Sequence, residues 1–170
     1  MSSGARLVRL TADHELTGFD CGNRELSAWL IEHALASHRA DLTRTYLALE
    51  RKTVAGYVSL TTGSVRREDA PTRHARGMPR HPIPTILLAR LAVDRRYQGA
   101  RLGSRLLAEA LRLAVETSDT VAARLVMVDA IDDRAAAFYR GRGFIDAPEN
   151  PLRLFRKVSD IRRSLVSTDP

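Results

Sequence analysis

A turn between a predicted strand and a predicted helix is where this sequence could hold a phosphate. Residues 86–93 form an apolar run interrupted only by Arg90, which predicts an interior strand covered on both faces. From Leu102 onward, apolar residues recur at the spacing of one helical face, which predicts an amphipathic helix with Gly103 and Ser104 in its first turn. The first amides of a helix lack internal acceptors, and the helix dipole adds partial positive charge, so this arrangement can cradle a pyrophosphate. The same pattern also fits an ordinary connection between a strand and a helix.

Arginine is the second chemical feature of the chain. The formal net charge is +7, and Lys52 and Lys157 are the only lysines, so arginine carries nearly all of the positive charge. Arginine binds phosphate bidentately and stacks on bases, which fits RNA as well as the phosphates of a cofactor. The densest group lies in residues 66–84, a stretch without periodicity that we expect to be a long functional loop. Genome composition and a solvated surface would also produce an arginine excess, and both interpretations stay open.

Periodicity and turn residues predict the elements that must position these groups. They indicate strands at residues 6–10, 45–50, 54–65, 123–130, 144–145 and 152–155, and helices at 23–39 and 132–140. The strands at 45–50 and 54–65 are spaced as a hairpin. We therefore expect an α/β fold, one mixed sheet with helices against both faces. A single domain is expected over residues 1–158, followed by a frayed polar tail at residues 159–170.

Several classes of protein are disfavoured by the sequence. We find no apolar stretch long enough to span a bilayer and no signal-peptide core near the start, so we expect a cytoplasmic protein without membrane contact. Cys21 is the sole cysteine, which excludes an intrachain disulfide and a cysteine-based metal site and suits a reducing compartment. His33 and His38 have no metal-ligand partner at helical spacing, so no metal is expected.

Two motifs resemble those of the GNAT superfamily of acetyl-CoA-dependent N-acetyltransferases. Its pyrophosphate motif is Gln or Arg, two residues, Gly, one residue, then Gly or Ala. That frame is filled here by Gln98, Gly99, Ala100, Arg101, Leu102 and Gly103. Arg101 stands where the first glycine is expected. Glycine serves such positions through unusual dihedrals or close ligand approach, so either the turn is shaped differently or the Arg101 side chain adds its own contact to phosphate.

The second motif of the family is Ala, two residues, Phe-Tyr, then Gly-Phe. It is matched by Ala135, Phe138, Tyr139, Gly143 and Phe144, with Asp132 where many members carry Asn. Longer segments, residues 19–30, 44–65, 78–94 and 135–144, are similar to one branch of the family. That branch comprises toxins that acetylate the amino group of aminoacyl-tRNA and are neutralised by a ribbon-helix-helix antitoxin. The resemblance implies acetyl-CoA as co-substrate, a block of translation, such an antitoxin as partner, and a homodimer.

The resemblance also assigns roles to residues. Tyr139 is the candidate catalytic residue, an acid that protonates the leaving thiol, because a phenol (pKa about 10) is only slightly less acidic than a thiol (about 8.5). The alternative is that Tyr139 is a core aromatic beside Phe138. The Val93 N–H is the candidate donor to the thioester carbonyl. The candidate cofactor-binding residues are Leu91, Ala92, Val93, Gln98, Gly99, Ala100, Arg101, Leu102, Gly103, Ser104, Asp132, Ala135 and Phe138.

The central strand has no obvious general base, since it carries Arg90 and ends in Asp94 where many members have a Glu. An aminoacyl α-amino group, with a pKa of about 7.7–8.0, is already partly neutral, whereas lysine at about 10.4 needs stronger deprotonation. This favours an aminoacyl acceptor. A buried unpaired arginine is costly, so we expect Arg90 to reach the acceptor end of tRNA or to pair with a carboxylate. The candidate tRNA-binding residues are Arg90, Arg39, Arg66, Arg67, Arg76 and Arg80.

Two other functions remain open at this stage. One is acetylation of a small amine or a protein N-terminus by an enzyme of the same family. The other is a non-catalytic basic module that binds RNA or protein and has lost its acetyl-CoA site, as the replacement of a motif glycine by Arg101 would allow.

Overall fold

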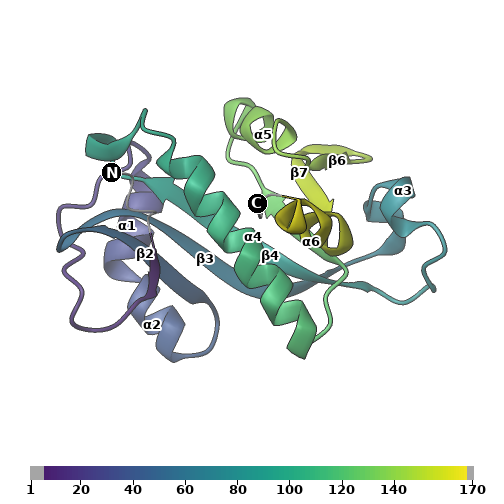
Figure 1. The fold of residues 1–170 in the computed structure, drawn as a ribbon, viewed down its shortest axis with the longest axis horizontal. Coiled ribbons are helices and arrows are strands. Elements are labelled where there is room, and N and C mark those ends of the chain that lie inside the picture. Colours follow the sequence, from purple (N-terminus) through teal and green to yellow (C-terminus); the bar gives the residue numbers. More distant parts are fainter. Residues whose placement is uncertain (1–5, 168–170) are drawn as a thin grey trace. The chain divides into compact units, whose positions relative to one another are not determined.

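Seven strands form one mixed sheet in the computed structural model, which describes residues 6–167 (Figure 1). Positions 1–5 of the expected domain and 168–170 of the expected tail lie outside the described residues. The strand order is β1-β2-β3-β4-β5-β7-β6, with β4 parallel to β5 and the β1–β2, β2–β3, β5–β7 and β6–β7 pairs antiparallel. With helices flanking the strands, this confirms the predicted α/β class. The strands are β1 (Leu7–Arg9), β2 (Arg44–Glu50), β3 (Thr53–Val65), β4 (Ile83–Val93), β5 (Leu125–Asp129), β6 (Ile145–Ala147) and β7 (Asn150–Lys157).

The chain divides into two compact units. The first contains the residues up to Thr61 together with Ala89–Ala110, and the second contains Thr62–Leu88 together with the residues from Leu111 onward. The helices are α1 (Arg24–Glu32), α2 (Ala34–Arg39), α3 (Thr72–Ala75), α4 (Leu102–Thr120), α5 (Asp133–Arg140) and α6 (Val158–Val166), with short 3₁₀ turns η1 (Arg67–Asp69) and η2 (Arg95–Tyr97). None of the described helices is long and apolar enough to cross a membrane.

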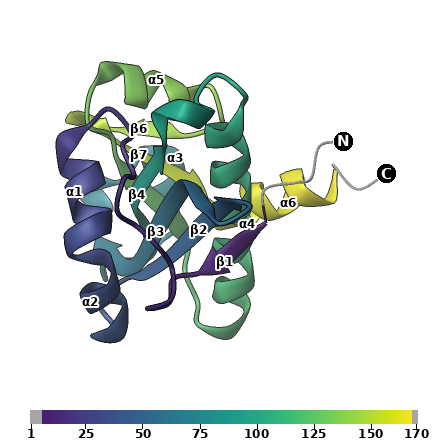
Figure 2. The same cartoon turned by 90° about the vertical axis from the view of Figure 1, so that its left-hand side faces the viewer.

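In the first unit, α1 and α2 lie on one side of β1, β2 and β3, and the start of α4 lies on the other (Figure 2). Asn23 caps α1 by accepting the Leu26 N–H at 3.0 Å, as the sequence predicts. The single helix expected over residues 23–39 is wrong, because His33 takes φ −124° and separates two helices. The apolar spacing continues across this break, since Ala34 is fully buried, and periodicity therefore could not reveal it.

The β2–β3 hairpin is confirmed, with Glu50 paired to Thr53 across a two-residue turn. Gly56 on β3 lies against β4 and the start of α4. A Cβ at this position would lie 2.9 Å from the carbonyl oxygen of Ala92 and 2.7 Å from the side chain of Leu106. Only glycine permits this close packing, which presses the last residues of β4 against β3.

In the second unit, β4 pairs with β5 from Thr85 to Leu88, and β5 continues the sheet to β7 and β6. Leu125, Met127 and Phe155 are the centre of a core that also takes in Val65 and Ile83. The stretch predicted as a loop over residues 66–84 contains η1 and α3 and runs into the start of β4.

The frayed tail expected from residue 159 is wrong for the residues that the structure describes. Residues Val158–Val166 form α6, with Val158 and Ile161 buried. Their three-residue spacing places both on one helical face, and α6 packs that face beside β7. The few apolar residues among many polar ones hid this short amphipathic helix from the sequence pattern.

We predict that Gly56→Ala destabilises the protein by about 1–3 kcal/mol, because a methyl group would collide with the backbone oxygen of Ala92. Urea unfolding followed by the fluorescence of Trp29, the only tryptophan, measures the change. The matched control is Gly141→Ala, at a helical φ of −62° with 3.5 Å of clearance, and it should be neutral or slightly stabilising. Equal stability of the two variants would contradict the close packing at Gly56.

Candidate active site

A buried carboxylate fixes the turn that leaves β4. Asp94 is 1% exposed and accepts the backbone N–H groups of Asp20 at 3.1 Å and Arg96 at 2.9 Å. The Arg96 guanidinium also donates two hydrogen bonds of 2.9 Å to the Asp94 carboxylate. These hydrogen bonds, with the Arg96 side chain first among them, lower the pKa of Asp94 to about 2 despite its burial. The carboxylate is therefore ionised at neutral pH and holds the turn in one shape.

The side chain of Gln98, the first residue of the motif, binds to the backbone of the protein itself. Its side-chain amide donates to the carbonyl oxygens of Cys21 and Val93, both at 2.9 Å. Gly99 follows with φ 86°, and Arg101 takes φ 62°. Arg101 thus adopts the left-handed conformation that a glycine at this motif position would adopt without strain. The turn therefore keeps the backbone shape expected with a glycine, despite the arginine. The Arg101 side chain is exposed and is available for a contact with phosphate.

The turn ends in a row of backbone donors at the start of α4. Within residues 6–167, the amide N–H groups of residues 99–103 have no hydrogen-bond acceptor. They lie just before and within the first turn of α4, a helix of 19 residues, whose dipole favours an anion at this end. The arrangement can therefore hold phosphate oxygens through the backbone, with Arg101 as an added cation.

The remaining cofactor candidates of the first unit lie on β4. Leu91, Ala92 and Val93 lie beyond the stretch of β4 that pairs with β5, which ends at Leu88. Ala92 is buried, and Leu91 and Val93 are half-buried. Ser104 lies in the first turn of α4 and is half-buried.

Tyr139 belongs to the second unit, on α5. It is 6% exposed, and its ring meets Phe138 and Phe144 edge to face at centroid distances of 5.2 and 5.5 Å. Burial raises the pKa of Tyr139 to about 12, so the phenol is protonated at every physiological pH. Within the described residues its hydroxyl has no hydrogen-bond partner, which leaves the proton available to a ligand.

Asp132 and Phe138, two other residues of the second motif, make contacts that stabilise α5. The Asp132 carboxylate caps α5 by accepting the Ala135 N–H at 2.8 Å. The Phe138 ring lies under the guanidinium of Arg142 at 3.8 Å. The structure therefore gives Asp132 a structural task that is the same as the one Asn performs at a helix N-cap.

Arg90 contacts an aromatic ring of the first unit. Its guanidinium lies 3.9 Å from the centre of the Trp29 ring, so its described contact is aromatic and not a carboxylate. Trp29 stacks in turn on Tyr57, whose hydroxyl donates to the Leu26 carbonyl at 2.7 Å. Burial lowers the pKa of Arg90, although arginine remains charged. The alternative of a carboxylate partner is therefore wrong within the described residues, and the contact of Arg90 with the acceptor end of tRNA stays a prediction.

The other candidate tRNA-binding arginines are divided between the units. Arg39 is exposed at the end of α2 in the first unit. In the second unit, Arg66 is held by Asp69 at 2.7 Å, and Arg80 is exposed. Arg67 and Arg76 line a hollow of about 360 Å³ beside α3.

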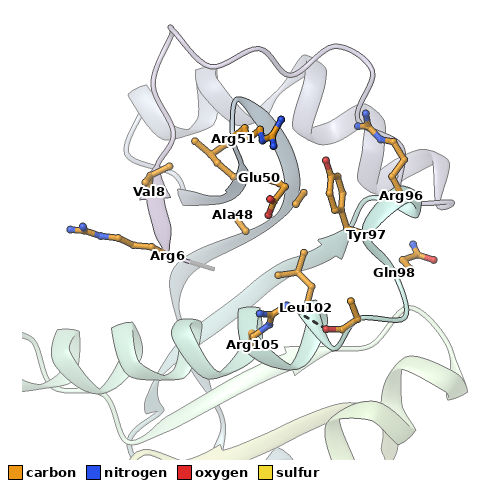
Figure 3. Close-up of a pocket in the computed structure, with 13 residues that line it drawn as sticks. Arg6, Val8, Ala48, Glu50, Arg51, Arg96, Tyr97, Gln98, Leu102 and Arg105 are labelled. Carbon is orange, nitrogen blue, oxygen red and sulfur yellow. Dashed lines mark hydrogen bonds between the residues drawn. The ribbon is translucent and has the colours of Figure 1, made fainter. Parts of the chain in front are cut away.

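A cavity of about 520 Å³ in the first unit was not foreseen from the sequence (Figure 3). Its wall includes four arginines, which come from the residue before β1, the β2–β3 turn, η2 and α4: Arg6, Arg51, Arg96 and Arg105. We call it the arginine pocket. No local pattern unites these residues, since they are far apart along the chain and come together only through the fold.

Comparison with known sequences identifies the family of the chain. Residues 10–144 match the acetyltransferase (GNAT) family. A curated relative, described as a tRNA-acetylating toxin of Mycobacterium tuberculosis, is 39% identical over 162 residues, which is 95% of this chain and 97% of the relative. A probable toxin TacT of Sinorhizobium fredii is 28% identical over 159 residues, 88% of each chain.

Solved structures show the same fold. AtaT complexed with acetyl-methionyl-tRNAfMet has a TM-score of 0.86 and 30% identity, covering 94% of this chain and 98% of that one. A tyrosine-to-phenylalanine mutant of AtaT, bound to the C-terminus of the antitoxin AtaR and to acetyl-CoA, has a TM-score of 0.81 and 31% identity over 95% and 97% of the two chains. The family match covers both the β4–α4 turn and the α5 motif, and the chain belongs to the acetyltransferase (GNAT) family.

Proposed function

We propose that this protein uses acetyl-CoA to acetylate the α-amino group of aminoacyl-tRNA and thereby blocks translation. The observation that carries the proposal is the 39% identity to a tRNA-acetylating toxin along 95% of the chain. The likeness to AtaT, solved with acetyl-methionyl-tRNA and in mutant form with acetyl-CoA, supports both the acceptor and the donor. The unpaired amides of residues 99–103 add a physical reason for a phosphorylated donor.

Binding of the donor is assigned to the β4–α4 turn. Acetyl-CoA supplies the acetyl group as a thioester and carries a pyrophosphate. Amides 99–103 and the Arg101 guanidinium are complementary to that pyrophosphate, while Asp94 and Gln98 keep the turn rigid without touching it. The Val93 N–H on β4 is our candidate donor to the thioester carbonyl.

Tyr139 is proposed to move the proton that the reaction transfers. The amine loses one proton as its nitrogen bonds to the acetyl carbon, and the departing sulfur gains one as the C–S bond breaks. With a pKa of about 12, Tyr139 is a weak acid, and a tyrosinate would not persist beside a thiol of pKa about 8.5. A relay, in which the phenol gives its proton to sulfur and is restored by the proton from nitrogen, leaves Tyr139 neutral before and after.

The acceptor amine needs little help from the protein. β4 carries no carboxylate between Ile83 and Val93, and the Asp94 carboxylate that follows is fully occupied by Arg96 and two backbone N–H groups. An aminoacyl α-amino group, with a pKa of about 7.7–8.0, is already partly neutral at physiological pH. This is consistent with an aminoacyl ester and disfavours a lysine side chain.

We further propose that the two compact units together make one acetyltransferase domain, since the family match at residues 10–144 extends through both. The resemblance to the tRNA-acetylating toxins supports a cytoplasmic homodimer with a ribbon-helix-helix antitoxin as partner. Solved complexes of AtaT with the antitoxin AtaR, one of them bound to DNA, are consistent with an antitoxin partner.

The direct test incubates the purified protein with labelled acetyl-CoA and either charged or uncharged tRNA. We expect label on charged tRNA only, and release of N-acetylaminoacyl-tRNA as product. Acetylation confined to small amines or protein N-termini would replace the proposal with the second enzymatic function. The absence of any acetyl-CoA binding would instead support a non-catalytic basic module.

For Tyr139→Phe we predict a fall in acetyl transfer of about 10²- to 10⁴-fold with little change in stability or in acetyl-CoA affinity. Phenylalanine keeps the packing against Phe138 and Phe144 and removes only the proton donor. Single-turnover transfer to charged tRNA measures the rate. Tyr46→Phe, a half-buried tyrosine on β2, is the matched control and should keep full activity. Full activity in Tyr139→Phe would reduce Tyr139 to a core aromatic.

For Arg101→Gly we predict two opposite effects. Removing a side chain from a φ of 62° should stabilise the fold by about 1 kcal/mol, which raises the melting temperature by roughly 2–4 °C. Losing the guanidinium should weaken acetyl-CoA binding, and the salt dependence of binding should decrease. Calorimetric titration at two salt concentrations gives the affinity. An unchanged affinity would show that the backbone amides hold the pyrophosphate without Arg101.

A further inference from the structure

The arginine pocket carries a net positive charge. Its lining contains four arginines and one carboxylate, Glu50, and one of the four, Arg96, is paired with the Asp94 carboxylate beside the pocket. Within residues 6–167, Arg6, Arg51 and Arg105 form no salt bridge. In Figure 3, Arg6 and Arg96 lie toward opposite ends of the pocket, with Arg51 between them. The charges are spread along the wall, which suits a ligand with several anionic groups in a row.

Two of these arginines are prepared for an anion in different ways. Arg96 is fixed by its two bonds to Asp94, and its three remaining N–H donors are therefore presented with little further loss of side-chain entropy. Among the described residues, Arg105 is held by one long bond of 3.3 Å to the Ala100 carbonyl, and its Nε is buried there without an acceptor. A buried donor without a partner costs about 1–3 kcal/mol, so an anionic acceptor that lets Arg105 reorient would relieve that cost.

Arg51 is an unexpected residue at its position. It lies at the tip of the β2–β3 turn with φ 57°, a left-handed conformation in which glycine and asparagine are favoured. Such strain costs about 1–3 kcal/mol and is typical of functional positions. In Figure 3, the Arg51 guanidinium points toward the pocket beside Tyr97. An asparagine would fit the backbone conformation but would lack this positive charge.

The rest of the wall favours a flat, partly apolar group. Val8, Ala48 and Leu102 contribute apolar side chains to the lining, and the Tyr97 ring points up from η2 on the right of the pocket (Figure 3). An aromatic ring beside a basic groove stacks bases of single-stranded nucleic acid, at about 1–3 kcal/mol per base. The volume of about 520 Å³ is within the usual range for a bound ligand.

We propose that the arginine pocket binds a single-stranded segment of RNA, with phosphates on Arg51, Arg96 and Arg105 and one base against Tyr97. The choice of RNA rests on the proposed function, in which an RNA is the substrate. An acidic peptide would use the arginines but would gain nothing specific from the aromatic ring. The pocket then adds a second contact with the substrate RNA, separate from transfer of the acetyl group.

The test measures binding of a labelled single-stranded RNA of about ten nucleotides by fluorescence anisotropy, without acetyl-CoA, over a series of salt concentrations. Arg51→Asn is the diagnostic variant because asparagine accepts the left-handed backbone, so folding is preserved. We expect the affinity for RNA to fall about 5- to 10-fold at 0.1 M salt. The slope of the logarithm of the binding constant against the logarithm of salt concentration should decrease in magnitude by about one. Lys52→Asn, which removes the same charge one residue away and outside the pocket wall, should have a much smaller effect.

Three outcomes would overturn the proposal. Equal losses in Arg51→Asn and Lys52→Asn would show that only general charge matters. Complete displacement of the RNA by acetyl-CoA would assign the pocket to the donor, because Gln98 and Leu102 are shared with the motif turn. Competition by a polyglutamate peptide at the same concentration as RNA would indicate a protein partner.

The assay also separates this proposal from the proposed function. RNA binding is measured without charged tRNA or donor, so it stands or falls whether or not the protein acetylates tRNA. Conversely, if Arg51→Asn acetylates charged tRNA with an unchanged KM, the proposed function survives and the pocket proposal fails.

Discussion

The ion pair between the buried carboxylate of Asp94 and the exposed guanidinium of Arg96 is the interaction on which the first unit depends. Asp94 stands where β4 ends, its own N–H donates to the Ala55 carbonyl on β3 at 2.9 Å, and its carboxylate receives the N–H of Asp20 from the segment before α1. Three segments are thereby joined at one charged group. A buried carboxylate is tolerated only when it is paired and hydrogen-bonded, and the lowered pKa of Asp94 reports that it is. The pair sets the direction in which the chain leaves β4 and where the free amides of α4 begin.

Phosphate binding and proton transfer require different chemical groups, and the two units carry different groups. Backbone amides and arginines on the first unit are suited to phosphate, since neither titrates near neutral pH. The phenol of Tyr139 on the second unit is suited to a proton, because burial keeps it protonated and its hydroxyl has no partner within the described residues. In this account, binding energy comes from groups of fixed charge, and proton movement is left to a group that returns to its starting state.

The sequence allowed much of this site to be predicted, because local patterns determine it. The apolar run of β4, the turn and the amphipathic α4 are contiguous, and the Asn23 cap and the β2–β3 hairpin follow from short-range rules. The family frame identified Arg101 as a departure, but only the structure shows that its backbone keeps the left-handed conformation of a glycine. The pairing of Arg90 with Trp29 could not be predicted, since an arginine in an apolar strand has several acceptable partners. Likewise, no sequence window contains the arginine pocket, and α6 has too few apolar residues to produce a clear period.

We propose that the β4–α4 turn holds the pyrophosphate of a thioester donor and that Tyr139 passes its proton to the departing sulfur. The decisive measurement is a crystal structure of the protein grown in excess acetyl-CoA. We expect pyrophosphate oxygens within hydrogen-bond distance of amides 99–103 and the Tyr139 hydroxyl directed at the thioester sulfur. A pyrophosphate bound elsewhere, or a Tyr139 hydroxyl that points away from the sulfur, would refute the proposal.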